Sequence, residues 1–259
     1  VMHALIFWFS VGILTPLVTR PAAQADNLCR MIEAAGGTAV RLPLQAIEPA
    51  HAPAAVARQL AEARDWQGWI FTSANAVRHA ALLDRGAWPQ LSAVGSATGA
   101  ALEAVGRRAS ILPTQGASAE ALLAEPEFQN VQGRRYLIVT GAGGLDVLMA
   151  TLRARGAHAE TAEVYRRVPL PYASDTVAEA VRRSDAAVVT SGEALEQLWQ
   201  LAPEDARRRL QSRPLVLPSA RVVERARQRG CTRPLEVAAP MSDGAILSCL
   251  ETALAPKTP

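Results

Sequence analysis

Three blocks of the sequence recur later in the chain, in the same order and at nearly the same spacing. Each block contains the end of an apolar run, a short turn and the start of a helical pattern. The offsets are 121, 118 and 124 residues for the pairs Leu17–Arg20 with Ile138–Gly141, Ile70–Val77 with Val188–Leu195, and Gly95–Gly106 with Ser219–Gly230. A spacing this constant predicts two similar halves of about 120 residues each.

Within both halves, short apolar or β-branched runs alternate with helical patterns, which is typical of α/β proteins with parallel sheets. Many of the runs are continuously apolar, as expected for strands covered by helices on both faces. The expected strands are 16–19, 38–42, 68–71, 91–94, 109–112, 135–139, 158–164, 186–189, 215–217 and 235–237. The expected helices are 22–35, 52–63, 74–86, 96–105, 118–123, 144–155, 174–183, 192–200, 220–229 and 243–253.

Two crossings bounded by prolines suggest how the halves connect. They lie at 44–48 and 164–170, where prolines stiffen the chain and disfavour helix. We therefore expect two flavodoxin-like or Rossmann-like α/β domains joined by a two-stranded linker, with a cleft between them. One domain is discontinuous, formed by residues 16–44 and 171–259, and the other spans residues 48–165.

Composition excludes several classes of protein. The net charge of +3 is small and dispersed, so we expect no nucleic-acid partner, and we assign the basic cluster Arg207–Arg209 to a solvated helix face. The four histidines are scattered and the three cysteines lack ligand spacing, so we expect neither a metal site nor a disulfide framework. The cysteines are interpreted as small buried hydrophobic residues in a reducing compartment.

The first residues do not fit the repeat. The apolar stretch from Ala4 to Leu14 is too short to span a bilayer and lacks a clear signal-peptide pattern. We interpret residues 1–15 as an extension that is not native, with a membrane tether as the alternative. We expect a cytoplasmic monomer.

A glycine turn at Thr140–Gly144 occupies the place of a phosphate-binding loop, between a strand and a helix. However, Asp146 stands where the dinucleotide fingerprint requires Gly, and no Lys-Ser/Thr pair completes a P-loop. We interpret the segment as a turn entering a helix, whose backbone N–H groups could still bind a carboxylate.

Hydroxyl side chains are concentrated where strands end and helices begin. Ser and Thr are common helix caps, so each residue alone has a structural explanation. Together they predict a multi-point anion site, because ligands of α/β sheets bind at the carboxyl ends of strands, near helix N-termini. The residues are Thr19, Thr72, Ser73, Ser96, Thr98, Thr140, Thr190, Ser191 and Ser219.

An ordered set of five motifs resembles the uroporphyrinogen-III synthase family over about residues 16–254. The motifs are Val18–Pro21, Phe71–Val77, Ala93–Thr98, Glu163–Arg167 and Val189–Gly192. The resemblance implies two α/β domains, an interdomain active site, no cofactor and the substrate hydroxymethylbilane. It also implies cyclisation with inversion of ring D, a product that feeds haem synthesis, and a substrate that hydroxymethylbilane synthase could hand over.

The same resemblance assigns roles to residues. Tyr165 matches the tyrosine of the family's Val-Tyr-Arg motif and is the candidate proton donor to the leaving hydroxyl, while a plain aromatic on a linker strand is the structural alternative. The implied substrate-binding residues are Thr19, Arg20, Thr72, Ser73, Asn75, Ser96, Thr98, Thr140, Gly141, Thr190, Ser191 and Ser219.

Two positions depart from this pattern. Val222 replaces the second-half counterpart of Thr98, and Glu193 puts a negative charge where the first half has Asn75. The alternative functions are a non-catalytic two-lobed protein that binds a tetrapyrrole or a small anion, and a fused regulator.

Overall fold

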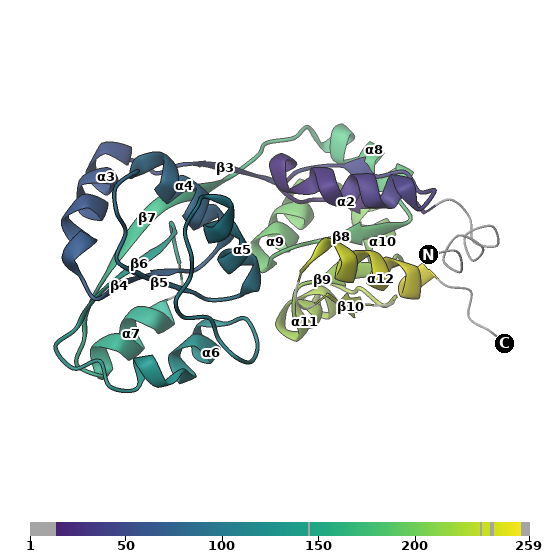
Figure 1. Cartoon of the computed structure of the whole chain (residues 1–259). Helices are drawn as coiled ribbons and strands as arrows, with labels where there is room; N and C mark the ends of the chain where they lie inside the picture. Colours follow the sequence, from purple (N-terminus) through teal and green to yellow (C-terminus); the bar gives the residue numbers. More distant parts are fainter. Residues whose placement is uncertain (1–13, 145, 234, 239–240, 255–259) are drawn as a thin grey trace. The chain divides into compact units, whose positions relative to one another are not determined.

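The computed structural model describes residues 14–144, 146–233, 235–238 and 241–254, so most of the proposed 1–15 extension lies outside the described residues. The chain divides into unit 1, Val1–Ala46 with Val168–Pro259, and unit 2, Ile47–Arg167. Each unit contains a mainly parallel sheet with helices on both faces (Figure 1), which confirms the predicted α/β fold class.

Unit 1 contains a five-stranded sheet of order β10-β9-β8-β1-β2. Its strands are β1 (Pro16–Val18), β2 (Val40–Arg41), β8 (Ala186–Val188), β9 (Leu215–Leu217) and β10 (Leu235–Val237). Its helices are α2 (Ala22–Ala34), α8 (Ser174–Arg183), α9 (Gly192–Leu201), α10 (Glu204–Gln211), α11 (Ala220–Gln228) and α12 (Asp243–Leu254). Strand β1 pairs in parallel with both β2 and β8.

Unit 2 contains a five-stranded sheet of order β3-β7-β6-β4-β5. Its strands are β3 (Gln45–Pro49), β4 (Gly68–Phe71), β5 (Gln90–Ala93), β6 (Arg135–Gly141) and β7 (His158–Pro169). Its α-helices are α3 (Pro53–Glu62), α4 (Ala74–Leu83), α5 (Ser96–Ala104), α6 (Ala119–Ala124) and α7 (Asp146–Ala154), with short 3-10 helices η2 (Ala63–Asp65) and η3 (Pro126–Phe128). The two expected crossings lie in β3 and β7, which are neighbours in this sheet.

The sequence repeat is visible in the strand orders. The repeat relates β2, β1, β8 and β9 of unit 1 to β7, β6, β4 and β5 of unit 2, and both sets stand in that order across their sheets. Beyond β9, unit 1 adds β10, whose Leu235 pairs with Leu215. The equivalent segment of unit 2 makes only an isolated bridge between Ser92 and Ile111. The expected strand at 109–112 was therefore wrong as a strand, although Ile111 does pair in parallel with Ser92 of β5.

Strand side chains alternate between two hydrophobic layers in each unit, since successive residues of a strand point to opposite faces. In unit 2, Trp69 and Phe71 pack with α3, α4 and α5, whereas Ile70 packs with α6 and α7. In unit 1, Leu17 packs with α8 to α11, and Val18 packs with α2 and α12. This burial on both faces explains why the strands are continuously apolar.

Left-handed glycines end the helices that follow the repeated turns. Gly106 and Gly230 have φ values of 71° and 85° and lie two residues beyond α5 and α11. Glycine adopts this conformation without a Cβ penalty, which explains why both repeat blocks end in this residue. In the part of the chain that the structure describes, no helix is long and apolar enough to cross a membrane.

Candidate functional site

Four hydroxyl side chains of unit 2 form two hydrogen-bonded pairs where β4, β6 and β7 approach their carboxyl ends. The Thr72 hydroxyl donates to Thr140 Oγ1 at 2.8 Å. Ser73 Oγ lies 3.2 Å from the Tyr165 hydroxyl. Because parallel strands end at the same edge of a sheet, residues from three separate segments meet here. The structure thus brings together four of the residues predicted from the sequence.

Ser73 also caps helix α4. Its backbone is extended, with φ −161° and ψ 159°, and its Oγ accepts a hydrogen bond from the Ala76 N–H at 3.1 Å. This bond satisfies one of the free N–H groups at the start of the helix. The half-buried Ser73 side chain therefore caps a helix and also lies at the predicted site.

A β-bulge directs Tyr165 toward this cap. The register of β7 against β6 shifts between Thr140 and Gly141, so that Glu163 pairs with Thr140 and Tyr165 pairs with Gly141. Val164 is the extra residue, and the shift lets Val164 and Tyr165 pack into the same hydrophobic cluster as α4. Without the bulge, normal alternation would point Tyr165 to the opposite face.

Glycine at position 141 makes room for the tyrosine ring. A Cβ on Gly141 would lie 2.7 Å from Cε2 of Tyr165, which is closer than real Cβ contacts. The Ala142 N–H also donates to the Tyr165 carbonyl at 2.8 Å and fixes the backbone beside the bulge. Gly141 therefore leaves the space that the Tyr165 ring occupies.

Tyr165 is 1% exposed, and its ring belongs to the hydrophobic core of unit 2. The Arg167 guanidinium reaches the phenol, with Nη2 donating to the Tyr165 oxygen at 3.0 Å, and its Cζ lies 5.4 Å from the ring centroid. The His79 ring lies 5.5 Å from the tyrosine ring, tilted by 31°. The hydrogen bonds of this side chain are thus made by its hydroxyl, while the ring packs in the core.

Burial lowers the pKa of His79 below its usual value, and the nearby positive charge of Arg78 lowers it further. An imidazole with a lowered pKa is neutral at pH 7. The cation beside the phenol is therefore Arg167 and not His79.

The glycine turn after β6 binds a carboxylate from its own chain. The Gly143 N–H donates to Glu163 Oε1 at 3.1 Å, and Gly143 has a φ of 71°. A Cβ on Gly144 would overlap the Thr140 side chain. The turn is therefore a strand-to-helix connection whose N–H group at Gly143 is already paired.

Three other predicted residues of unit 2 lie on the first turns of helices. Thr98 is buried in the first turn of α5, where its N–H donates to the Gly95 carbonyl at 3.0 Å. Ser96 begins the same helix and is exposed. Asn75 lies in the first turn of α4 and accepts a hydrogen bond from Arg78 at 3.1 Å.

The corresponding residues of unit 1 follow the same pattern. Ser191 caps α9 by accepting from the Ala194 N–H at 3.0 Å, next to the half-buried Thr190. Ser219 stands at the N-cap of α11 without a side-chain capping bond. Thr19 is 1% exposed and donates to the Val188 carbonyl at 2.8 Å, so its hydroxyl joins β1 to β8.

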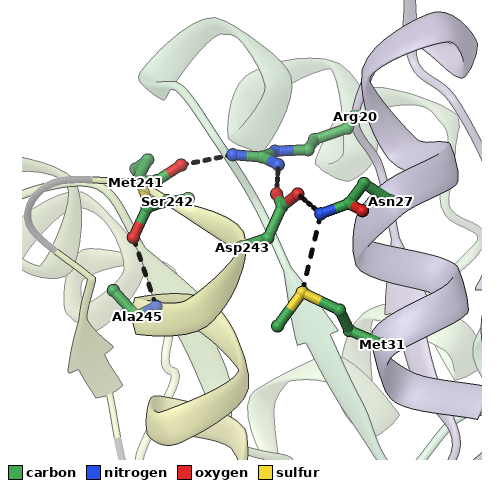
Figure 2. Close-up of polar contacts among 7 residues, drawn as sticks. All are labelled: Arg20, Asn27, Met31, Met241, Ser242, Asp243 and Ala245. Atoms are coloured by element: carbon green, nitrogen blue, oxygen red, sulfur yellow. Dashed lines mark hydrogen bonds and ion pairs between the residues drawn. The ribbon is translucent and has the colours of Figure 1, made fainter. Parts of the chain in front are cut away.

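Arg20 is held by the C-terminal helix. Figure 2 shows its guanidinium between the Asp243 carboxylate and the Met241 carbonyl, and it donates to both. The other Asp243 oxygen accepts a hydrogen bond from Asn27 at 2.7 Å. The charge of Arg20 is thus already neutralised by an ion pair, and a substrate carboxylate would have to compete with Asp243.

The two departures from the expected pattern lie at the same edge of unit 1. Val222 is buried at 6% exposure, so it contributes packing where its repeat partner Thr98 has a hydroxyl. Glu193 is exposed in the first turn of α9, where its charge suits the positive end of the helix dipole.

Sequence reasoning missed three residues at these edges. Arg167 and His79 contact Tyr165, and Arg225 lies against the start of α9, where a Cβ on Gly192 would come within 2.8 Å of its Nη1. Arg167 belongs to the motif that carries Tyr165 and could have been singled out there. Among the described residues, no group of three or more His, Cys, Asp and Glu side chains could hold a metal ion.

Comparisons with known proteins agree on one family. The family model described as uroporphyrinogen-III synthase HemD matches residues 26–246. The chain is 34% identical over 246 residues to uroporphyrinogen-III synthase of Escherichia coli, covering 91% of this chain and 99% of the relative. It is also 34% identical over 245 residues to the enzyme of the same name from Salmonella typhimurium, covering 91% of this chain and 99% of the relative.

Solved structures show the same fold. A mutant uroporphyrinogen III synthase from Thermus thermophilus matches with a TM-score of 0.62 at 20% identity, covering 93% of this chain and 98% of that one. Uroporphyrinogen-III synthetase from Helicobacter pylori matches with a TM-score of 0.58 at 14% identity, covering 92% of this chain and 99% of that one.

Proposed function

The chain belongs to the uroporphyrinogen-III synthase family, and on that premise we propose that it converts hydroxymethylbilane to uroporphyrinogen III, with loss of water and inversion of ring D. The observation that carries the proposal is the family match across residues 26–246, joined by relatives that this chain matches over nearly their whole length. The non-catalytic binding protein considered from the sequence is not favoured, because these relatives are all synthases.

The reaction makes modest demands on the protein. Departure of the terminal hydroxyl gives an azafulvene that the pyrrole itself stabilises, and attack from the substituted carbon of ring D then gives a spiro intermediate. This intermediate fragments and recloses with the ring inverted. The enzyme has to hold the linear chain in the required conformation, assist departure of the hydroxyl and prevent direct closure. Positioning of bound groups provides most of such an acceleration.

For unit 2 we assign departure of the hydroxyl to the Ser73–Tyr165 pair. A phenol that donates a hydrogen bond can stabilise negative charge as it develops on the leaving oxygen. The 3.2 Å contact between the two hydroxyls and the Arg167 hydrogen bond support this assignment.

We assign substrate binding to the starts of the helices, where N–H groups and the positive dipole end favour anionic groups. In this assignment Thr72, Asn75, Ser96, Thr98, Thr140 and Gly141 contribute from unit 2, and Thr19, Arg20, Thr190, Ser191 and Ser219 contribute from unit 1. The half-buried or exposed members can contact substrate directly. Of the buried members, Thr19 holds the end of β1 against β8 through its hydroxyl, and Thr98 packs in the first turn of α5.

The linear substrate closes to the wrong isomer without catalysis, so we infer direct handover from hydroxymethylbilane synthase. We infer that the enzyme acts as a cytoplasmic monomer.

A coupled assay tests the function. Hydroxymethylbilane is generated in place and the uroporphyrinogen isomers are separated after reaction with and without the protein. We expect isomer III in its presence and isomer I in its absence. Isomer I alone in both reactions would refute the proposed activity and favour a binding role.

A further inference from the structure

The direction of the hydrogen bonds around Tyr165 is partly determined by chemistry. A guanidinium has donors and no acceptor, so in its 3.0 Å contact with Arg167 the phenol oxygen must be the acceptor. The single phenol proton is therefore not directed at Arg167. Within the described part of the chain, the other hydrogen-bonding partner of the phenol is Ser73 Oγ, at 3.2 Å.

Ser73 can accept that proton while keeping its role as a cap. Its oxygen has two lone pairs, and the Ala76 N–H occupies one of them at 3.1 Å. If the second lone pair accepts from Tyr165, the serine's own proton is free to point elsewhere. Ser73 is half-buried, whereas Tyr165 is 1% exposed, so Ser73 is the member of the pair that a substrate can reach.

We propose that Arg167, Tyr165 and Ser73 form a directed proton chain, in which Ser73 delivers the proton to the departing hydroxyl, Tyr165 replaces it, and Arg167 is the positioning residue. This inference rests on the proposed function and deepens it. It explains how a tyrosine buried in the core takes part in chemistry on a large substrate. Hydrogen-bonded chains of this kind polarise one another in a low-dielectric interior.

Each proton that Tyr165 and Ser73 pass on is returned to them within one catalytic cycle. As the C–O bond of the substrate breaks, its electron pair leaves with the oxygen, which takes the Ser73 proton and departs as water. The Tyr165 proton moves to Ser73 Oγ, and the phenolate that remains is stabilised by the Arg167 guanidinium. Ring closure later releases one proton from a pyrrole carbon. That proton returns through Ser73 to Tyr165 and restores the starting state.

The other groups around the phenol are consistent with this direction. His79, on α4, has a pKa lowered by burial, so it is neutral and adds no competing charge. Glu163, two residues before Tyr165 on β7, uses a carboxylate oxygen on the Gly143 N–H. Thr72 donates to Thr140 and belongs to a separate pair.

The neighbouring arginine provides a matched control for Arg167. Arg166 is also exposed on β7, but it pairs with Glu48 at 2.5 Å. We expect Arg167→Met to lower kcat about 10-fold with KM nearly unchanged, since a hydrogen bond from a charged donor is lost at the reacting group. Arg166→Met should change neither constant, and Arg167→Lys should restore part of kcat.

A spectroscopic measurement follows Tyr165 directly and without turnover. With tyrosine labelled by a heavy carbon isotope at Cζ, Tyr165→Phe identifies the Tyr165 resonance among those of the three tyrosines. Arg167→Met should move this resonance and Arg166→Met should not. A resonance unmoved by Arg167→Met would overturn the positioning role.

Ser118 provides the control for Ser73. It caps α6 by accepting from the Ala121 N–H at 3.1 Å, the same geometry that Ser73 has with Ala76. Ser73→Ala and Ser118→Ala should therefore lose similar stability. Only Ser73→Ala should lower kcat, by about 10-fold or more.

The outcomes separate this inference from the proposed function. If the wild type makes no isomer III, the function fails, whatever the spectra show. If it makes isomer III but Arg167→Met raises KM and leaves kcat intact, then Arg167 binds substrate and the proposed proton chain is wrong. Equal kcat values for Ser73→Ala and Ser118→Ala would also overturn the proposed proton chain.

Discussion

Tyr165 combines two environments in one side chain, a buried ring and a hydroxyl with polar partners. The ring contacts His79 and the core of unit 2, while the oxygen meets Ser73 and Arg167. A phenylalanine would keep the ring contacts and lose only the polar ones. The substitution therefore separates the structural contribution of this residue from its chemical one.

We expect Tyr165→Phe to fold normally and bind substrate, but to form isomer III more slowly. Loss of one general acid typically costs about 10²–10⁴-fold, and the low end applies because the azafulvene forms readily in water. Thr98→Ala should instead raise KM. The measurement is steady-state formation of isomer III, with Tyr136→Phe on β6 as control. Turnover at the wild-type rate with an unchanged isomer ratio would make Tyr165 a structural residue.

Gly141 gives a second test at the residue scale. We expect Gly141→Ala to displace the tyrosine ring, because the new methyl group would overlap it. Overpacking of this kind costs about 1–3 kcal/mol of unfolding free energy. Denaturant unfolding measures the loss, and the labelled Tyr165 resonance reports the displacement.

Gly244 in α12 is the control for this substitution. A Cβ there would meet nothing within 4 Å, so Gly244→Ala should be neutral or slightly stabilising. If the two variants unfold alike, then Gly141 does not make room for Tyr165.

At the scale of elements, one ion pair joins the loop after β1 to the last helix. Arg20 and Asp243 have side chains only 12% and 21% exposed, so solvent screens their interaction weakly. Asn27 of α2 bonds to the same carboxylate. Asp243 therefore ties α12 to both β1 and α2, as Figure 2 shows.

We expect Asp243→Ala to loosen α12, since it leaves Arg20 without its charge partner. The loss is about 2 kcal/mol, as for hydrogen bonds to charged groups. Hydrogen exchange of α12 amides should speed up before the rest of unit 1 is affected. Asp26→Ala is the control, because the Asp26–Arg41 pair is 65% and 44% exposed and should contribute little. Equal protection of α12 in both variants would contradict the role of Asp243.

Most elements were predictable from the sequence because their signals are local. The strands at 68–71, 215–217 and 235–237 and the helix at 174–183 have the expected bounds. The expected strand at 38–42 is reduced to Val40–Arg41, and the one at 158–164 continues to Pro169. The length of a strand depends on which residues of a neighbouring strand pair with it. The sequence of the strand alone does not identify those residues.

The details of the site were less predictable for the same reason. The sequence indicated Ser73 and Tyr165, but their contact depends on the bulge opposite Gly141, a long-range feature of two strands. The ion pair of Arg20 joins residues 223 positions apart, so the sequence near Arg20 gave no sign of it. Whether these residues contact substrate stays a prediction.

At the scale of the whole molecule, each hydrophobic cluster formed by the described residues belongs to one unit. The clusters around Phe71 and Phe128 contain only residues of Ile47–Arg167. Those around Leu17 and Ile246 contain only residues of the other unit. Each unit combines strands from both halves of the sequence repeat, β1 and β2 with β8 to β10 in unit 1 and β3 to β5 with β6 and β7 in unit 2, and each unit buries its own core.

A fragment of residues 47–167 should therefore fold by itself. Its core is complete, and three of the five tryptophans, Trp66, Trp69 and Trp88, lie within it. The ring centroids of Trp69 and Trp88 are 5.3 Å apart, so near-UV circular dichroism reports this packing directly. We expect a cooperative denaturant transition and a tryptophan signal like that of the full chain. A fragment without a cooperative transition, under conditions where the full chain has one, would mean that unit 2 needs the rest of the chain to hold its core.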